Sequence, residues 1–282
     1  MVLGFSLPER TSVTEYTNHQ DYIEFRQALC PLVLYKSMVA LTTPFNQKNM
    51  QFKLQKANER GTADHGWLKA KHSFSFASYY HPEKMNFGAL RVLNDDIIAG
   101  GMGFGMHPHD NMEIITIPLE GALEHKDSIG NIGYIEAGDV QVMSAGTGVQ
   151  HSEFNPSKAE PVRFLQIWII PDNKKTLPQY QQISVAPSAK LKQWCCIVSN
   201  HKQENSILIS AAVRMYACIL QAEQRIDKQL SSNKAWLQIV SGQIMINDVT
   251  LYAGDGAALD NETQLSIQAQ QQSEMLLIEC HT

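Results

Sequence analysis

Two short tracts of this chain carry residue types that bind metal ions. The first is a His-Pro-His tract with His107 and His109, and the second, 42 residues further on, is a His-Ser-Glu tract with His151 and Glu153. Side chains of a β-strand repeat every second residue, so both members of each tract point to one face of their strand. Two such strands facing each other inside a barrel would bring three imidazoles and a carboxylate to one point. This set of donors suits a divalent transition metal.

The bulk composition indicates a globular protein of the cytoplasm. The chain has 282 residues, of which 44% are hydrophobic and 18% charged, and this is enough for two domains with their own cores. A net charge of −5 without a cluster of Lys and Arg argues against direct binding to nucleic acid. Five cysteines without a Cys-x-x-Cys pair fit a reducing compartment. The apolar tract 32–41 is interrupted by Lys36 and is too short to span a membrane, and no basic region at the start marks a signal peptide.

The order of the remaining chain predicts an all-β protein. Residues 90–170 are expected to form short strands, because apolar segments alternate with turns rich in Gly, Asn and Asp. A second β-rich stretch covers residues 236–279, and its Ala-Gly-Asp turn at 253–255 repeats the turn at 137–139. We therefore expect two related sandwiches or barrels, one of which has diverged. A polar segment closed by prolines, 171–178, is predicted to link them.

Residues 1–49 differ from the rest of the chain, since they contain no metal-type tract and no clear alternation. The ordered pattern starts at Met50, which can itself serve as an initiator. We interpret 1–49 as an upstream extension of the gene or a loosely attached tail. The alternative is a helical appendage, with a short helix over 21–29 that Pro31 would end.

The flanks of the two tracts resemble known motifs. Gly101, the His-Pro-His tract and Glu113 resemble the first motif of the cupins, which are small jelly-roll barrels that hold a metal inside. Gly138, His151 and Asn155 resemble the second motif. More specific tracts look like those of the pirins, a family of cupins: residues 64–68, 72–76, 87–93, 119–125, 143–148 and 151–156.

The resemblance to pirins runs from Phe52 to Ile170, and the remainder is similar to the second half of short bacterial pirins with quercetinase activity. It implies an all-β fold of two cupin barrels in tandem, and residues 1–49, which have no counterpart in the pirin pattern, add a short, partly helical N-terminal extension. The predicted domains are the extension (1–49, with disorder or a misassigned start as alternatives), a metal-binding cupin (50–172), a linker (173–185) and a metal-free cupin (186–282).

The resemblance also implies one mononuclear metal ion on three histidines and one glutamate. Carried over to this sequence, the ligands are His107, His109, His151 and Glu153. The general cupin pattern would nominate Glu113 as the carboxylate, whereas the His-Ser-Glu tract typical of pirins favours Glu153. Glu113 would then be a neighbour of the site. Iron(II) is the expected metal, and Mn, Co, Ni, Cu and Zn are alternatives, because such sites accept several divalent ions.

The other histidines and the aromatic residues near the first barrel have simpler interpretations. Four histidines are assigned to the fold or the pocket wall, with His125 nearest the cavity: His65, His72, His81 and His125. His201 and His281 have no His-x-His partner, so the second unit is expected to bind no metal. Packing in the core and between the barrels is favoured over an aromatic substrate wall for five residues: Trp67, Phe74, Phe76, Tyr79 and Tyr80.

A site with three histidines and one carboxylate leaves positions open on the metal, as catalytic sites do. It keeps a net positive charge, which favours a phenolate oxygen such as the deprotonated 3-hydroxyl of quercetin. Glu153 is expected to accept that proton as a general base. The family resemblance implies that O2 then cleaves the central ring with loss of carbon monoxide, which is the reaction of a quercetin 2,3-dioxygenase.

Two other functions stay open. Pirins also resemble co-regulators that sense redox state through their metal and act through protein partners, so the alternative is a partner-binding protein. A sugar-binding or storage cupin is a weaker alternative, because the tracts specific to pirins argue against it. The expected binding partners are a flavonol-like small molecule, O2 and, in the alternative, a protein. The default oligomeric state is a monomer.

Overall fold

The computed structural model describes residues 52–202 and 205–281. The predicted extension over 1–49, with its helix at 21–29, lies outside the described residues. Apart from strands, the described residues form a 3-10 turn, η2 (Ala57–Glu59), and one short helix, α3 (Pro187–Lys190). No helix in this part of the chain is long and apolar enough to cross a membrane.

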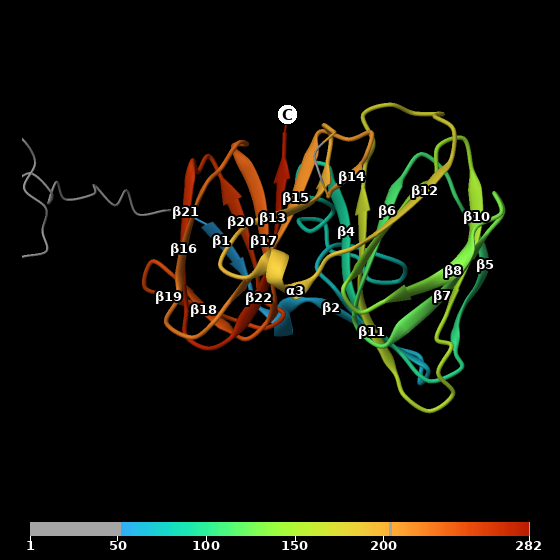
Figure 1. Ribbon diagram of the computed structural model, residues 1–282, viewed down its shortest axis with the longest axis horizontal. Coiled ribbons are helices and arrows are strands. Elements are labelled where there is room, and N and C mark those ends of the chain that lie inside the picture. Colours follow the sequence, from blue (N-terminus) through green and yellow to red (C-terminus); the bar gives the residue numbers. More distant parts are fainter. Residues whose placement is uncertain (1–51, 203–204, 282) are drawn as a thin grey trace, which may run out of the picture. The chain divides into compact units, whose positions relative to one another are not determined.

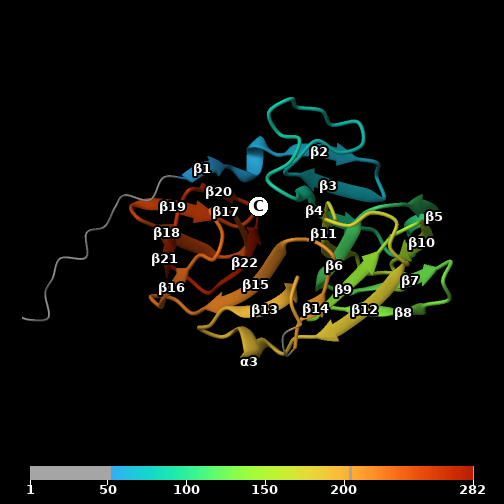
Figure 2. The same ribbon diagram turned by 90° about the horizontal axis from the view of Figure 1, so that it is seen from above.

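The strands build two barrels, each made of a seven-stranded and a four-stranded sheet (Figures 1 and 2). In the first barrel the large sheet has the order β12 (Gln179–Ser184), β9 (Asp139–Ser144), β6 (Glu113–Glu120), β11 (Val162–Ile169), β4 (Leu90–Ile98), β3 (Leu68–His72) and β2 (Gly61–Asp64), and the small sheet has the order β5 (Gly103–His109), β10 (Val149–Phe154), β7 (Ala122–Asp127) and β8 (Ile132–Glu136).

In the second barrel the large sheet has the order β1 (Phe52–Gln55), β20 (Gly256–Asp260), β17 (Lys234–Ser241), β22 (Ser273–Cys280), β15 (Val213–Leu220), β13 (Cys195–Ser199) and β14 (Ile207–Leu208), and the small sheet has the order β16 (Arg225–Gln229), β21 (Gln264–Ala269), β18 (Gln243–Ile246) and β19 (Val249–Tyr252). The two barrels therefore correspond strand by strand except at one edge, where β2 pairs antiparallel with β3 and β14 pairs parallel with β13. The prediction of an all-β fold with two related barrels in tandem is confirmed.

One edge strand of each large sheet, β12 in the first barrel and β1 in the second, is far along the chain from the strand with which it pairs. β1 precedes the first barrel but pairs with β20 of the second, with Phe52 opposite Leu259. β12 follows the first barrel, within the predicted linker 173–185, and pairs along its whole length with β9. The segment predicted to be a linker thus contains a strand of the first barrel. The range 50–172, predicted to be the first domain, opens with a strand of the second.

The repeated Ala-Gly-Asp turns hold these two edge strands in place. In the first barrel, the carboxylate of Asp139 accepts hydrogen bonds from Nε2 of Gln182, over 2.9 Å, and from the hydroxyl of Ser184. Both donors lie in β12. In the second barrel, the carboxylate of Asp255 accepts a hydrogen bond of 2.7 Å from the backbone N of Ala57, just after β1. The same turn therefore anchors an incoming strand in both barrels.

We expect Asp139→Ala to lower the free energy of unfolding by about 2–3 kcal/mol, because the hydroxyl of Ser184 loses its acceptor and Nε2 of Gln182 keeps only the carbonyl oxygen of Tyr134. Urea denaturation followed by circular dichroism measures this change. Glu136→Ala is the matched control, since Glu136 is exposed in the same turn, and it should stay within about 0.5 kcal/mol of the wild type. Equal stabilities for the two variants would show that Asp139 does not anchor β12.

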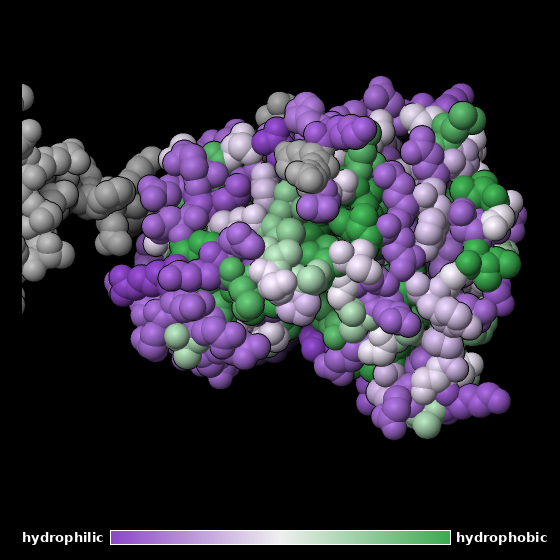
Figure 3. All heavy atoms as spheres, in the orientation of Figure 1, coloured by the Kyte–Doolittle hydropathy of each residue, from purple (hydrophilic) through white to green (hydrophobic). Residues whose placement is uncertain are grey.

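The barrels share one apolar core and differ inside. The largest apolar cluster contains residues of both large sheets, such as Leu165 and Met215, and Figure 3 shows apolar side chains gathered along the boundary between the barrels. The interior of the second barrel is filled by apolar side chains. Its small sheet contributes some of them, including Leu265 and Ile267 of β21. The first barrel instead has two separate apolar clusters. Between them its interior is polar.

Candidate metal centre

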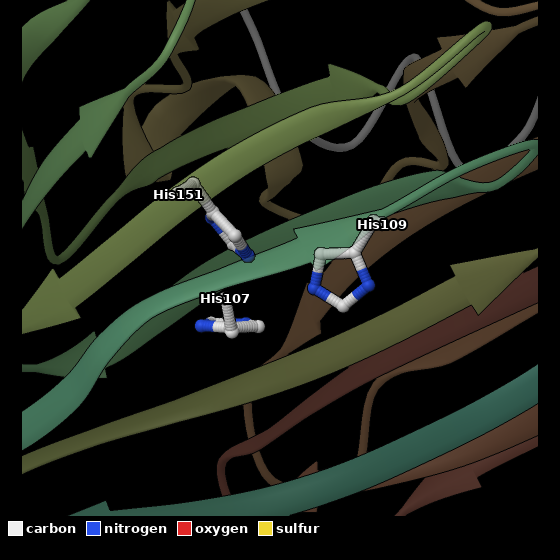
Figure 4. Close-up of side chains that lie close together, drawn as sticks. All are labelled: His107, His109 and His151. Carbon is white, nitrogen blue, oxygen red and sulfur yellow. The ribbon is translucent and has the colours of Figure 1, made fainter.

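Three histidines converge inside the first barrel from two neighbouring strands. His107 and His109 lie on β5, and His151 lies on β10 directly opposite His107. Their ring centroids are 4.4 Å apart for His107 and His151, 4.8 Å for His107 and His109, and 5.0 Å for His109 and His151. One nitrogen of each ring lies within 4.8 Å of the others. Figure 4 shows the three rings pointing toward one another.

Each of these histidines has at least one ring nitrogen that is available to bind a ligand. Nδ1 of His107 donates a hydrogen bond of 2.8 Å to the carbonyl oxygen of Gly105, and this leaves the lone pair on Nε2. Nε2 of His109 and both nitrogens of His151 are buried without a hydrogen-bond partner among the described residues. Burial of polar atoms without partners is unfavourable. One nitrogen from each of the three rings therefore fits a metal ion, which would supply a missing partner to His109 and to His151.

Burial keeps the imidazoles of His109 and His151 neutral, which is the form that binds metals. Desolvation, with the neighbouring His107, lowers the pKa of His109 to about 4. Desolvation and the adjacent rings of His107 and His109 lower the pKa of His151 to about 2. A ring that stays unprotonated keeps its lone pair across the physiological pH range.

Glu153 lies next to this cluster, at the centre of a small polar network. One oxygen of its carboxylate and nitrogens of His151 and His125 form a second group of donors within 4.8 Å of one another. Oε1 lies 3.1 Å from the hydroxyl of Thr116, and Oε2 accepts a hydrogen bond of 3.1 Å from Nε2 of Gln166. Complete burial raises the pKa of Glu153 to about 7, although both partners oppose the shift. The sequence interpretation did not include Thr116 and Gln166.

The competing carboxylate, Glu113, lies on the opposite face of its strand. It begins β6, in which Ile114 and Thr116 point into the barrel and Ile115 joins the core between the barrels. The carboxylate of Glu113 accepts a hydrogen bond of 2.5 Å from Ser144, and burial raises its pKa. Among the described residues, Glu113 belongs to neither group of potential metal donors. Its distance of three residues from Thr116 explains this, because an odd separation reverses the face of a strand.

The remaining predicted histidines divide between the site and its surroundings. His125 is buried beside the ring of His151 at 5.5 Å, and its Nε2 lies 3.1 Å from Oδ2 of Asp127. His65 and His72 line the cavity in front of the site. His81 stays outside it and accepts a hydrogen bond from the loop through Nδ1. His201 and His281 belong to neither donor group in the described ranges.

A cavity of about 560 Å³ opens beside the site, and His107, His109 and Glu153 are part of its lining. Two aromatic pairs line it: Trp67 with Phe104, whose centroids are 5.4 Å apart, and Phe76 with Trp168, 5.3 Å apart. Its volume lies within the range of about 300–1,000 Å³ that is usual for small-molecule pockets. Aromatic walls of this kind fit a flat ring system.

The five aromatic residues considered in the sequence thus serve different purposes. Trp67 and Phe76 line the cavity, so packing alone does not describe them. Phe74 packs against Trp236 of the second barrel at 5.0 Å, as expected for a residue between the barrels. Tyr79 stacks on His72 at 6.2 Å, and Tyr80 is exposed to solvent.

Comparison with known proteins gives the family. Two family models match the chain: Pirin over residues 53–169, and the quercetinase C-terminal cupin domain over residues 196–280. Quercetin 2,3-dioxygenase of Escherichia coli is 44% identical over 227 residues, which cover 80% of this chain and 97% of that protein. The chain belongs to the pirin family.

A further relative and a solved structure support the assignment of this chain to the pirin family. A pirin-like protein of Caulobacter vibrioides is 41% identical over 221 residues, covering 78% of this chain and 95% of its own. Among solved structures, the nickel(II) complex of a bacterial pirin from Escherichia coli is 42% identical, covers 82% of this chain and 99% of its own, and has a TM-score of 0.78. The similarity therefore extends over both barrels of this pirin.

The close pairing of β5 and β10 depends on a glycine. A Cβ atom at Gly103 would overlap the backbone of Glu153 and Phe154, whereas a Cβ atom at Gly105 would meet nothing within 4 Å. The two strands also change register between His151 and Glu153. Gly103 therefore lets β5 approach the strand that carries His151 and Glu153.

We expect Gly103→Ala to lower the free energy of unfolding of this pirin by about 1–3 kcal/mol, because the added methyl group forces β5 away from β10. The metal content after loading and dialysis should fall with it. Gly105→Ala, in the same strand, is the control and should change stability by no more than about 0.5 kcal/mol. Thermal unfolding and metal analysis of both variants measure these changes, and identical behaviour would contradict the argument.

Proposed function

We propose that this pirin is a metal-dependent quercetin 2,3-dioxygenase, which cleaves flavonols with O2. The observation that carries the proposal is the convergence of three imidazoles, with unpaired nitrogens on His109 and His151, beside a buried carboxylate at a cavity with aromatic walls. The family comparison supports it, because a relative that this chain matches over nearly the whole of its length is named quercetin 2,3-dioxygenase. The proposed metal ligands are His107, His109, His151 and Glu153.

Iron(II) is the metal we propose, with Mn, Co, Ni, Cu and Zn as alternatives. The nitrogen and oxygen donors suit any of these ions, and the related pirin from Escherichia coli was solved with nickel(II). When bound, the ion supplies the positive charge that holds a deprotonated hydroxyl and the redox chemistry that O2 requires. The residues of the protein orient the substrate and accept its proton.

Glu153 is proposed to accept the proton of the 3-hydroxyl. It is the buried carboxylate beside the proposed metal ligands, and carboxylates serve as general bases when they lie within reach of the proton. Thr116 and Gln166 hold its carboxylate in one orientation. The pairs formed by Trp67 with Phe104 and by Phe76 with Trp168 line the cavity, where they would orient the flat substrate and exclude water.

The test is to load the protein with Fe(II) without oxygen and then add quercetin and O2. Loss of flavonol absorbance with parallel release of carbon monoxide is expected. The same assay with Mn, Co, Ni and Cu identifies the ions that support turnover. Absence of turnover with every ion would overturn the proposal.

The co-regulator function has a separate structural feature in its favour. On the outer face of the small sheet of the first barrel, Met106 and Phe154 are exposed on the same strands that carry the histidines, and Ile132 and Tyr134 are exposed on β8. A protein partner at this face would contact the strands of the site directly. Partner binding that changes with the redox state of the metal, in a protein without quercetin turnover, would favour this function.

A further inference from the structure

One buried carboxyl on the cavity wall takes no part in the chemistry described so far. Asp96 lies on β4 with only 4% of its surface exposed, and its Oδ1 has no hydrogen-bond partner within the described residues. The neighbouring Asp95 points to the other face of β4 and bonds Arg163 through two contacts of 2.9 Å. Buried polar atoms nearly always have a partner. The exception at Asp96 therefore requires an explanation.

No polar group of the described residues lies within hydrogen-bond distance of Oδ1 of Asp96. In the register of the large sheet, Asp96 lies opposite Ala70 and Phe164, which are apolar. Asn94, two residues before Asp96 on β4, is hydrogen-bonded to Nδ1 of His72 over 2.9 Å. Asp96 lines the same cavity as the proposed metal ligands and the aromatic pairs. The free oxygen thus borders the space that a ligand would occupy.

We propose that Asp96 accepts a hydrogen bond from a phenolic hydroxyl of the substrate, remote from the oxygen held at the metal, and so selects hydroxylated flavonols. This inference rests on the proposed function. A carboxyl oxygen accepts hydrogen bonds, and a hydroxyl on a flat ring held between aromatic walls is the donor that this cavity would present to it. A substrate without that hydroxyl leaves Asp96 unpaired. Sites built to bond a hydroxyl reject analogues that lack it.

Anaerobic titrations of the metal-loaded protein test this inference without turnover. Quercetin carries hydroxyls on both outer rings, and 3-hydroxyflavone carries only the hydroxyl next to the carbonyl. We expect the wild type to bind quercetin about 10–100-fold more tightly, as judged by the shift in flavonol absorbance. Asp96→Leu, which keeps the shape and removes both oxygens, should lose this preference and bind 3-hydroxyflavone as before. Asp96→Asn keeps an acceptor oxygen and should retain most of it.

A stability measurement separates recognition from a structural role. Because Asp96 has an unpaired buried oxygen, Asp96→Leu should raise the melting temperature of the metal-free protein by about 2–4 °C. Gln141→Met is the matched control: Gln141 is 1% exposed, its Nε2 is also unpartnered, and it does not line the cavity. This variant should leave both flavonol affinities unchanged. A lower melting temperature for Asp96→Leu would assign Asp96 to the fold and overturn the inference.

The outcomes also distinguish this inference from the proposed function. Selective binding of quercetin that depends on Asp96, without cleavage in the presence of O2, would leave the inference standing and overturn the function. Cleavage of both flavonols with equal affinities would do the reverse. Failure to bind either flavonol would overturn the role of Asp96.

Discussion

Replacing His151 with alanine is expected to leave the protein without its metal ion and to reduce quercetin cleavage by at least about a hundredfold. His151 is the most deeply buried of the three histidines, and it is the one residue shared by both groups of potential donors. Even the loss of an outer partner of a metal ligand costs about 10–100-fold in affinity or activity. The loss of a ligand should exceed this. Metal analysis after loading and dialysis, together with flavonol absorbance, measures both effects.

His201→Ala is the matched control for this prediction. His201 is an exposed histidine of the second barrel and belongs to neither group of donors within the described residues. It should retain the full metal content and full turnover. If the His151→Ala protein also kept a full complement of metal and cleaved quercetin at the wild-type rate, the proposed site would be wrong.

The face on which the histidines lie could be predicted because it depends only on local geometry. The period of two in a strand fixes that His107 and His109 share a face, and the same holds for His151 and Glu153. The pairing of β5 and β10 places His151 opposite His107, whereas Glu153 shares a group of donors with His151 and His125 and not with His107 and His109. The two partners of the Glu153 carboxylate could not be found in this way. They come from β6 and β11 of the other sheet, and only the closure of the barrel places them there.

The duplication of the barrel was visible in the sequence, but the exchange of edge strands was not. The Ala-Gly-Asp turns repeat locally, whereas the role of Asp139 depends on a strand 43 residues further along the chain. β12 is a polar segment with the sequence Gln-Tyr-Gln-Gln-Ile-Ser, which has little of the apolar alternation that marks a strand. The unpaired backbone groups at the edge of β9 determine its conformation. Such pairing is a property of the folded sheet and leaves little trace in the segment itself.

Glu153→Gln is expected to reduce quercetin cleavage by about 10²–10⁴-fold, the usual contribution of a general base. The amide has nearly the same shape and keeps one acceptor oxygen for Thr116 or Gln166, so the fold should persist. It cannot accept a proton, and it is a weaker metal ligand than a carboxylate. The metal content of the variant, its circular dichroism spectrum and its rate of quercetin loss separate these effects. A rate within a factor of about three of the wild type would remove Glu153 from the proposed mechanism.

Glu113→Gln decides between the two carboxylates that the sequence left in competition. Glu113 is also buried and also has a raised pKa, so the two variants remove a charge from similar environments. Its side chain bonds Ser144 on the far side of the large sheet, away from the histidines. We therefore expect this variant to keep its metal and its turnover, and to change only the melting temperature. If Glu113→Gln were inactive and Glu153→Gln active, the general cupin pattern would describe this pirin better than the His-Ser-Glu tract does.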